Sequence, residues 1–449
     1  MENRRSILEY FEEQKSFLDS TVRENIERYR KGDCILSLVD SMGNPITDAT
    51  VFVKQKSHAF RFGANLFMLD ELETKEKNDA YKQAFADVFN MATLPFYWDT
   101  LEPERGKPRY SADSPKVYRR PAIDLCLAFC EQHGIEPREH ALAYDHFFPA
   151  WLADATVEEV KEALEHRYAQ IAERYADRIP TIEVTNEMGW KQGVTRFYDE
   201  PDFVSWCFEK AEEYFPRNEL VINEVTRHCW EDCCRATDNY YAYIEANIRK
   251  GARIDAIGMQ FHSFHKAEDE YEKTRNKYNP ISLYRHMDLY SGLGKPLQVT
   301  EVTVPAYSNE AEDEAIQAEI IEKLYTVWFS HPAMKQIIYW NLVDGYAYVP
   351  YTDPERIAAS QGDMTLGENV YYGGLLRFDM TPKPAYYAIK KLLQNVWHTE
   401  QQLTADSSGL FRFRGFFGTY DATVTVNGKT YTKELSLNKG DMLPIQITL

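Results

Sequence analysis

The sequence lacks any long apolar run. No stretch of its 449 residues approaches the roughly 20 consecutive apolar residues of a transmembrane helix. The first 15 residues are rich in charged side chains and contain no apolar core of a secretory signal. We therefore expect a cytoplasmic protein without a membrane span.

Basic residues are scarce relative to acidic ones. Lysine and arginine total 51 and aspartate and glutamate total 70, which gives a formal net charge of −19. Proteins that bind nucleic acid or anionic lipid present a basic face to phosphate groups. The charge balance therefore argues against both kinds of partner and leaves uncharged ligands open.

Cysteine is also infrequent. The seven cysteines are odd in number and irregularly spaced, which is typical of reduced thiols rather than of a disulfide framework. His228, Cys229, Cys233 and Cys234 could supply four metal ligands, but their spacing does not match a standard zinc finger or ribbon. We predict free thiols at these positions and no bound metal or other cofactor.

The hydrophobic pattern divides the chain into four parts. Periodic apolar side chains over 1–32 predict an amphipathic helix, and alternation on both sides of a Gly-Asn-Pro turn predicts a β-hairpin over 33–59. Residues 60–398 form the largest domain. Alternation resumes over 399–449, where Asn427-Gly428 is typical of a tight hairpin turn. Neither β segment is long enough to be stable alone, so we expect them to pack into one small accessory domain.

The largest domain alternates short apolar runs with helical patterns. This alternation predicts a (β/α)8 barrel, in which each parallel strand is followed by a helix. A doubly wound open sheet is the alternative, but it normally carries Gly-x-Gly-x-x-Gly after its first strand, where this chain has Arg61-Phe-Gly-Ala-Asn65. The eight predicted strands are 60–66, 89–96, 139–144, 179–185, 220–224, 254–260, 297–302 and 336–342.

Polar side chains gather where the predicted strands end, and the active site of a barrel lies at that end. Carboxylates can serve as acid and nucleophile, amides and histidines bind hydroxyl groups, and Trp and Tyr rings stack on sugar faces. Two carboxylates across a barrel mouth predict hydrolysis of a glycosidic bond, with retention if they lie about 5–5.5 Å apart. The strand ends supply His140, Asp145, Asn186, Glu187, Asn223, Glu224, Gln260, His262, Glu301, Trp340 and Asn341.

The motifs at these positions resemble those of glycoside hydrolase family 10, the endo-β-1,4-xylanase family. Thr185-Asn-Glu187 and Val299-Thr-Glu301 are similar to its two catalytic segments. Gly258-Met-Gln-Phe-His262 resembles its Gly-x-Gln-x-His motif, and 140–151 resembles its His-x-Leu-x-Trp-His segment with the following Pro-x-Trp. The resemblance spans roughly residues 30–395.

The resemblance implies a role for each matching residue. Glu187 would be the acid/base and Glu301 the nucleophile of a retaining, double-displacement mechanism. Asn186 would bind the sugar 2-hydroxyl and His262 would orient Glu301. The sugar next to the scissile bond would be lined by Gln260, Trp151 and Trp340, and His140 is a further predicted substrate contact.

The second and third strands depart from the family pattern. The family's Glu-Asn-x-Met-Lys-Trp is replaced by Thr93-Leu-Pro-Phe-Tyr-Trp98, so that Tyr97 stands where the family has lysine. The Trp-His pair is replaced by Tyr144-Asp145. We expect Tyr97, Trp98 and Asp145 to contact substrate, and the substrate to be a xylan-related or other plant-type oligosaccharide or glycoside.

Two other functions are compatible with the same residues. A non-catalytic barrel that only binds carbohydrate would explain the changed second strand, although the intact carboxylate pair counts against it. A metal-dependent hydrolase would use His140, His262 and His265, but the first strand offers no metal ligands.

Overall fold

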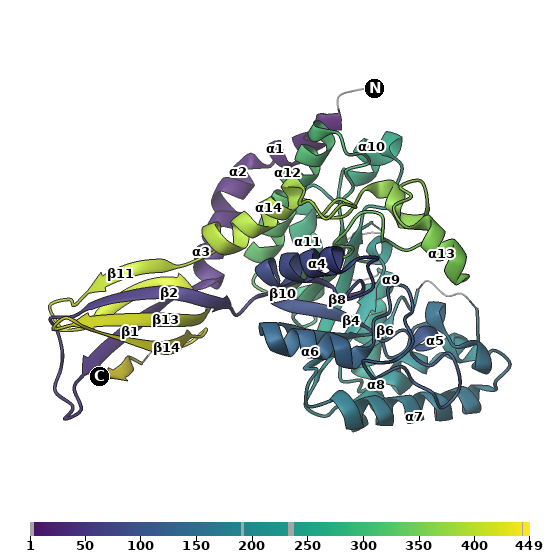
Figure 1. The fold of residues 1–449 in the computed structure, drawn as a ribbon, viewed down its shortest axis with the longest axis horizontal. Helices are drawn as coiled ribbons and strands as arrows, with labels where there is room; N and C mark the ends of the chain where they lie inside the picture. The colour runs from purple at the N-terminus through teal and green to yellow at the C-terminus, as the bar shows by residue number, and fades with distance from the viewer. Residues whose placement is uncertain (1–3, 190–192, 232–237, 442) are drawn as a thin grey trace.

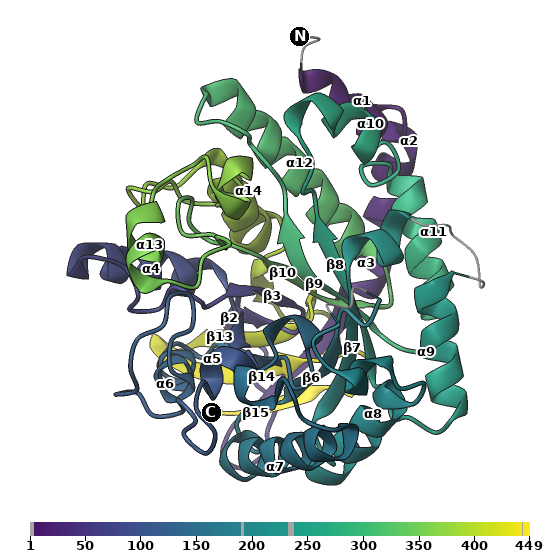
Figure 2. The same ribbon diagram turned by 90° about the vertical axis from the view of Figure 1, so that its right-hand side faces the viewer.

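The computed structural model describes residues 4–189, 193–231, 238–441 and 443–449. Its centre is a closed barrel of eight parallel strands in chain order, closed by pairing of the last strand with the first. Figure 2 shows this ring with helices around it. The strands are β3 (Arg61–Asn65), β4 (Met91–Pro95), β5 (Glu136–His140), β6 (Thr181–Asn186), β7 (Glu219–Glu224), β8 (Ala256–His262), β9 (Leu297–Thr303) and β10 (Met334–Tyr339).

A helix follows each barrel strand and covers its outer face. Local signals fix several helix ends: Thr156 and Glu159 form a capping box at the start of α7, and Gly134 ends α6 in the left-handed conformation. The predicted (β/α)8 barrel is therefore confirmed. The eight covering helices are α4 (Lys75–Val88), α6 (Ile123–His133), α7 (Val157–Tyr175), α8 (Phe203–Tyr214), α9 (Asn239–Arg249), α11 (Pro280–Ser291), α12 (Ala311–Ser330) and α14 (Pro384–Lys391), and shorter helices are α5 (Trp98–Leu101), α10 (Glu270–Thr274) and α13 (Pro354–Ser360).

Strand β5 lies three residues earlier than predicted. The apolar residues after His140 suggested a strand over 139–144, but beyond the strand only Ala143 makes a bridge, to Thr185. The true strand contains Arg138 and Glu139, which are both fully buried. Arg138 is stabilised inside the barrel by an ion pair with Glu183 of β6. A strand that buries charged residues does not show the apolar pattern used to find it.

The two ends of the chain form a β-sandwich beside the barrel (Figure 1). The apolar faces of its two sheets meet in a separate core that includes Leu36, Val53 and Val424. The predicted accessory domain is confirmed, and Asn427 and Gly428 make the expected tight turn with φ of 50° and 72°. One sheet has the order β12 (Phe411–Phe416), β1 (Lys31–Val39), β15 (Ile445–Thr448), and the other β11 (Glu400–Thr404), β2 (Thr50–His58), β13 (Gly418–Val426), β14 (Lys429–Leu437).

The predicted hairpin over 33–59 is wrong. Strand β1 pairs with β12 and β15, whereas β2 pairs with β11 and β13, so the two strands lie in opposite sheets. Both bury one face in the same core, which produces the alternation seen in the sequence. Alternation identifies a strand with one buried face but does not specify its partner.

The N-terminal segment is helical but not one continuous helix. It consists of η1 (Arg4–Leu8), α1 (Glu9–Glu12), α2 (Lys15–Phe17), η2 (Leu18–Val22) and α3 (Arg23–Tyr29). These turns keep Ile7, Phe11, Val22 and Ile26 buried in the barrel's core cluster, which a straight helix would not do along a curved surface.

Two remaining predictions concern membranes and cysteines. In the described part of the chain, no helix is long and apolar enough to span a membrane. The cysteines of the described residues, Cys229 among them, are all buried. Cys233 and Cys234 of the suggested metal cluster lie outside the described residues.

Candidate active site

A cavity of about 550 Å³ opens at the carboxyl ends of the barrel strands. Glu187 directly follows β6, with a positive φ of 56°, and Glu301 lies within β9. Both carboxylates line this cavity, as the sequence predicted. The predicted site residues that line it are Tyr97, His140, Asn186, Glu187, Gln260, His262, Glu301 and Trp340.

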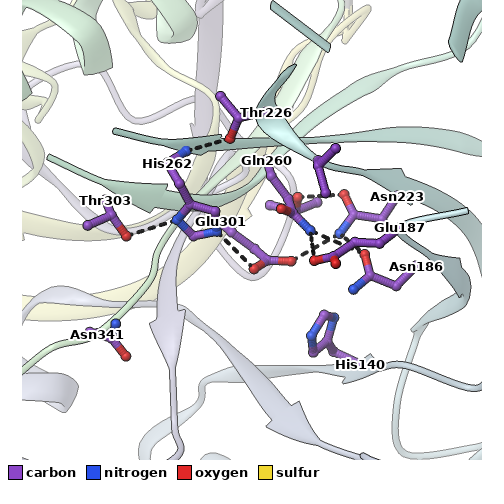
Figure 3. A network of polar contacts seen from close by, with 12 residues as sticks. His140, Asn186, Glu187, Asn223, Thr226, Gln260, His262, Glu301, Thr303 and Asn341 are labelled. Atoms are coloured by element: carbon purple, nitrogen blue, oxygen red, sulfur yellow. Dashed lines mark hydrogen bonds and ion pairs between the residues drawn. The ribbon is translucent and has the colours of Figure 1, made fainter. Parts of the chain in front are cut away.

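A network of amides connects the two carboxylates (Figure 3). Gln260 Nε2 donates to Glu187 Oε1 at 2.9 Å and lies 3.3 Å from Asn186 Oδ1. Asn223 Nδ2 lies 3.0 Å from the same Asn186 oxygen and 3.1 Å from Glu301 Oε1. The hydroxyl of Thr300 donates to Asn223 Oδ1 at 2.7 Å and fixes the orientation of that amide. The positions of both carboxylates therefore depend on one set of side chains.

His262 holds the second oxygen of Glu301. Its Nε2 lies 3.2 Å from Glu301 Oε2, and its Nδ1 lies 2.9 Å from the hydroxyl of Thr303. Burial lowers the pKa of His262 to about 4, so the imidazole is neutral at neutral pH. A neutral imidazole carries one N–H. When Nε2 carries it and donates to the Glu301 carboxylate, Nδ1 accepts a hydrogen bond from the Thr303 hydroxyl, so the two contacts select one tautomer.

The electrostatic surroundings of Glu301 favour its protonated form. Burial raises its pKa to about 8; the nearby His140 opposes this shift, and the charges of Glu183 and Glu187 add to it. Glu301 is only 3% exposed to solvent. Ionisation of Glu301 at this buried position is thus energetically costly.

A second buried network includes His140 and Tyr97, which line the cavity, and extends to Glu183. His140 Nδ1 lies 2.8 Å from Glu183 Oε1, and its Nε2 lies 2.9 Å from the hydroxyl of Tyr97. Burial disfavours the charge of Glu183, but His140 and Arg138 outweigh it and lower the pKa of that carboxyl. For His140, burial is likewise outweighed by Glu183, and its pKa is raised. Each group therefore stabilises the charged form of the other.

One group of side chains could hold a metal ion. Ligand atoms of His140, Glu183 and Glu301 lie within 4.8 Å of one another. His140 and Glu183 already bond to each other, and Arg138 pairs with Glu183. Among the described residues, His262 and His265 do not join such a group with His140. The absence of a metal cofactor stays a prediction.

Three predicted substrate contacts do not line the cavity. The indole nitrogens of Trp98 and Trp151 both donate to Glu102, to its carboxylate at 2.9 Å and its carbonyl at 2.8 Å. Asp145 is buried and accepts a hydrogen bond from the backbone of Gly193 at 3.2 Å. These side chains build the loops behind the cavity wall. Their spacing in the sequence could not distinguish this position from one in the wall.

Several cavity residues were missed by the sequence prediction. They come mostly from loops, where no periodic pattern indicates which way a side chain points. The adjacent Arg119 and Arg120 lie in the long loop between α5 and α6, and their dibasic pair was the one available signal. The missed polar residues include Arg119, Arg120, Glu231, Lys273, Lys277 and Glu368.

Several known proteins are similar to this chain in sequence and fold. The 10B xylanase of Thermotoga petrophila, solved in complex with xylobiose, superposes with a TM-score of 0.58 at 23% identity, covering 75% of this chain and 95% of that one. Endo-1,4-beta-xylanase B of Thermotoga neapolitana is 24% identical over 349 residues, which are 75% of this chain and 88% of the relative.

Other relatives also match the sandwich region. Anti-sigma-I factor RsgI6 of Acetivibrio thermocellus is 27% identical over 423 residues, which are 93% of this chain but 48% of that protein. This chain therefore spans about half the length of that relative. The model of the family described as Glycosyl hydrolase family 10 matches residues 55–392, which include the whole barrel. The resemblance predicted from the motifs is confirmed, and the chain belongs to glycosyl hydrolase family 10.

Proposed function

We propose that this protein is a retaining glycoside hydrolase that cleaves β-glycosidic bonds in a xylan-related or other plant-type oligosaccharide. The observation that carries the proposal is the pair of carboxylates from β6 and β9, which face one cavity and are held by one amide network. The relatives named as xylanases support the substrate class.

The proposed reaction is a double displacement. The Glu301 carboxylate attacks the anomeric carbon, and Glu187 donates its proton to the leaving oxygen as the glycosidic bond breaks. Glu187 then takes a proton from water, whose oxygen displaces Glu301 and restores the free carboxylate. Asn223 Nδ2 and His262 Nε2 orient the two oxygens of Glu301 during both steps.

A panel of aryl β-glycosides tests the proposal. Xyloside, xylobioside, glucoside, cellobioside, galactoside and arabinoside would be compared beside soluble xylan. We expect release from at least one glycoside, loss of it in Glu301→Ala, and unchanged release in Glu434→Ala, whose side chain is exposed on the sandwich. Glu187→Ala should slow poor leaving groups far more than activated ones, because only the former need a proton. Normal activity in Glu301→Ala would refute the assignment.

A second function has one observation in its favour. One relative matches 93% of this chain, including the sandwich, and is named as an anti-sigma factor rather than as a hydrolase. We propose, as the alternative, a barrel that binds oligosaccharide without cleaving it. Calorimetric binding of xylo-oligosaccharides without turnover of any glycoside in the panel would favour this alternative.

A further inference from the structure

Two adjacent arginines line the cavity next to Tyr97. Arg119 and Arg120 belong to the loop between α5 and α6 and are 4% and 7% exposed. The guanidinium of Arg120 lies over the ring of Tyr97, 3.8 Å from its centroid, and Phe67 and Phe147 also face it at 5.3 and 5.2 Å. Aromatic rings therefore fix the plane of this guanidinium.

Most donors of these two side chains have no protein partner. Arg119 uses Nη1 to reach Asn341 Oδ1 and the carbonyl of Tyr346, and Arg120 uses Nη1 to reach the carbonyl of Arg119. Within the described ranges, Nε and Nη2 of both arginines donate to nothing, and both Nε atoms are fully buried. The buried Arg167, by contrast, donates to three backbone carbonyls.

The charge of the pair has no direct ion-pair partner. The buried Arg138 and Lys383 are paired with Glu183 and Asp344, but no carboxylate of the described chain lies within 4 Å of Arg119 or Arg120. The buried Asp99 acts on Arg120 only at longer range. Two buried positive charges without a carboxylate in contact are costly to hold. Two basic side chains are thus buried side by side, although the protein as a whole carries a net charge of −19.

The two arginines do not serve the catalytic carboxylates. The charges that act most strongly on Glu301 are those of His140, Glu183, Glu187 and Arg138. Arg119 does tie its loop to the segment after β10 through Asn341 and Tyr346. That structural role uses Nη1 and leaves Nη2 of this cavity-lining residue without a partner among the described residues.

We propose that the cavity takes an acidic oligosaccharide, and that Arg119 and Arg120 bind the carboxylate of a uronic acid unit beside the scissile bond. This inference rests on the hydrolase function proposed above. A carboxylate matches the planar guanidinium, which offers paired donors. A single negative charge also suits a cavity that contains Glu187 and Glu301, because a dianion would be repelled by both.

The test uses two ligands that differ in one group. A glucuronosyl-substituted xylo-oligosaccharide and its carboxyl-reduced form carry the same sugars, with a carboxylate or a primary alcohol. Binding to the Glu301→Ala protein is measured by calorimetry, so that no turnover occurs. We expect the acid to bind about 10- to 100-fold more tightly, as is typical of charged hydrogen bonds. The preference should shrink as salt is raised.

Variants locate the effect. In the Glu301→Ala protein, a second substitution, Arg120→Gln, should remove most of the preference for the acid. Arg105→Gln should leave the preference intact, because Arg105 is an exposed residue of the same loop and does not line the cavity. Arg120→Lys retains the charge without the planar fork and should keep a smaller preference. Thermal melting of each variant shows whether it is folded, and the salt dependence tests the wild-type arginine pair without any change at Arg120.

The outcomes separate this inference from the proposed function. Equal affinity for the acid and its reduced form, or no binding of either, would overturn the acidic-substrate inference, even if neutral aryl glycosides are hydrolysed through Glu301. A preference for the acid that disappears in Arg120→Gln would support it, even if no glycoside is turned over. Loss of affinity for both ligands alike in a folded Arg120→Gln protein would also overturn it.

Discussion

Replacement of Glu301 by glutamine should stabilise the protein, and more so at high pH. The pKa of Glu301 is raised from 4.5 to about 8, chiefly by burial. The folded protein therefore keeps this proton up to about pH 8, whereas the unfolded chain loses it near pH 4.5. As the pH rises from about 4.5 to about 8, the folded state therefore becomes less stable relative to the unfolded state. Above pH 8 the loss of folding stability is complete.

The magnitude follows from the size of the shift. A difference of about 3.5 pKa units corresponds to roughly 5 kcal/mol of lost stability above pH 8, since one unit is about 1.4 kcal/mol. Glutamine has nearly the same shape but does not titrate. It can accept from Asn223 and donate to His262, which can reverse its tautomer. For a domain the size of 55–392, this free energy raises the melting temperature by about 7 °C.

The assay compares two pH values. Melting temperatures of wild type and Glu301→Gln would be measured at pH 5 and pH 9, and the difference between them should be small at pH 5 and large at pH 9. Glu434→Gln, at an exposed site, provides the matched control for loss of one charge. An equal stabilisation by Glu301→Gln at both pH values would refute the argument from burial.

Three further predictions concern the site and the sandwich. Hydrolysis of an activated aryl glycoside should increase with pH up to about 8, as Glu301 loses its proton and becomes nucleophilic; a profile flat from pH 5 to 8 would contradict this. His262→Ala should lower kcat on the same substrate by about 10- to 100-fold, with little change in melting temperature, because it removes a hydrogen bond to a charged group. Leu36→Ala should destabilise the sandwich by about 2–5 kcal/mol, seen as an earlier unfolding step in calorimetry, while activity at 25 °C is unchanged.

The sequence predicts the positions of side chains correctly where the barrel itself fixes those positions. The carboxyl ends of parallel strands all meet at one face, so polar residues at the strand ends are brought to the same face of the barrel. Glu187, Gln260 and Glu301 were predicted on this basis, and all three line the cavity. Their positions required no knowledge of the loops.

The errors occur where contacts are made by residues distant in the sequence. The closeness of β1 and β2 in the chain predicts that they pair with each other, although their partners are 346 to 409 residues away. Arg119 and Arg120 lie in an irregular loop, in which side-chain direction depends on packing against Phe67 and Tyr97. Neither kind of contact leaves a periodic signal.

The side chains between Glu187 and Glu301 explain how one carboxylate can act as the acid and the other as the nucleophile. Among the described side chains, the hydrogen bonds that connect Glu187 to Glu301 pass through amides, from Gln260 to Asn186 and from Asn186 to Asn223. Amides donate hydrogen bonds but do not take up or release protons near neutral pH. A proton on Glu187 therefore has no path to Glu301 through these side chains. The network positions the two groups closely enough for their charges to interact while keeping the acid and the nucleophile distinct, which a double displacement requires.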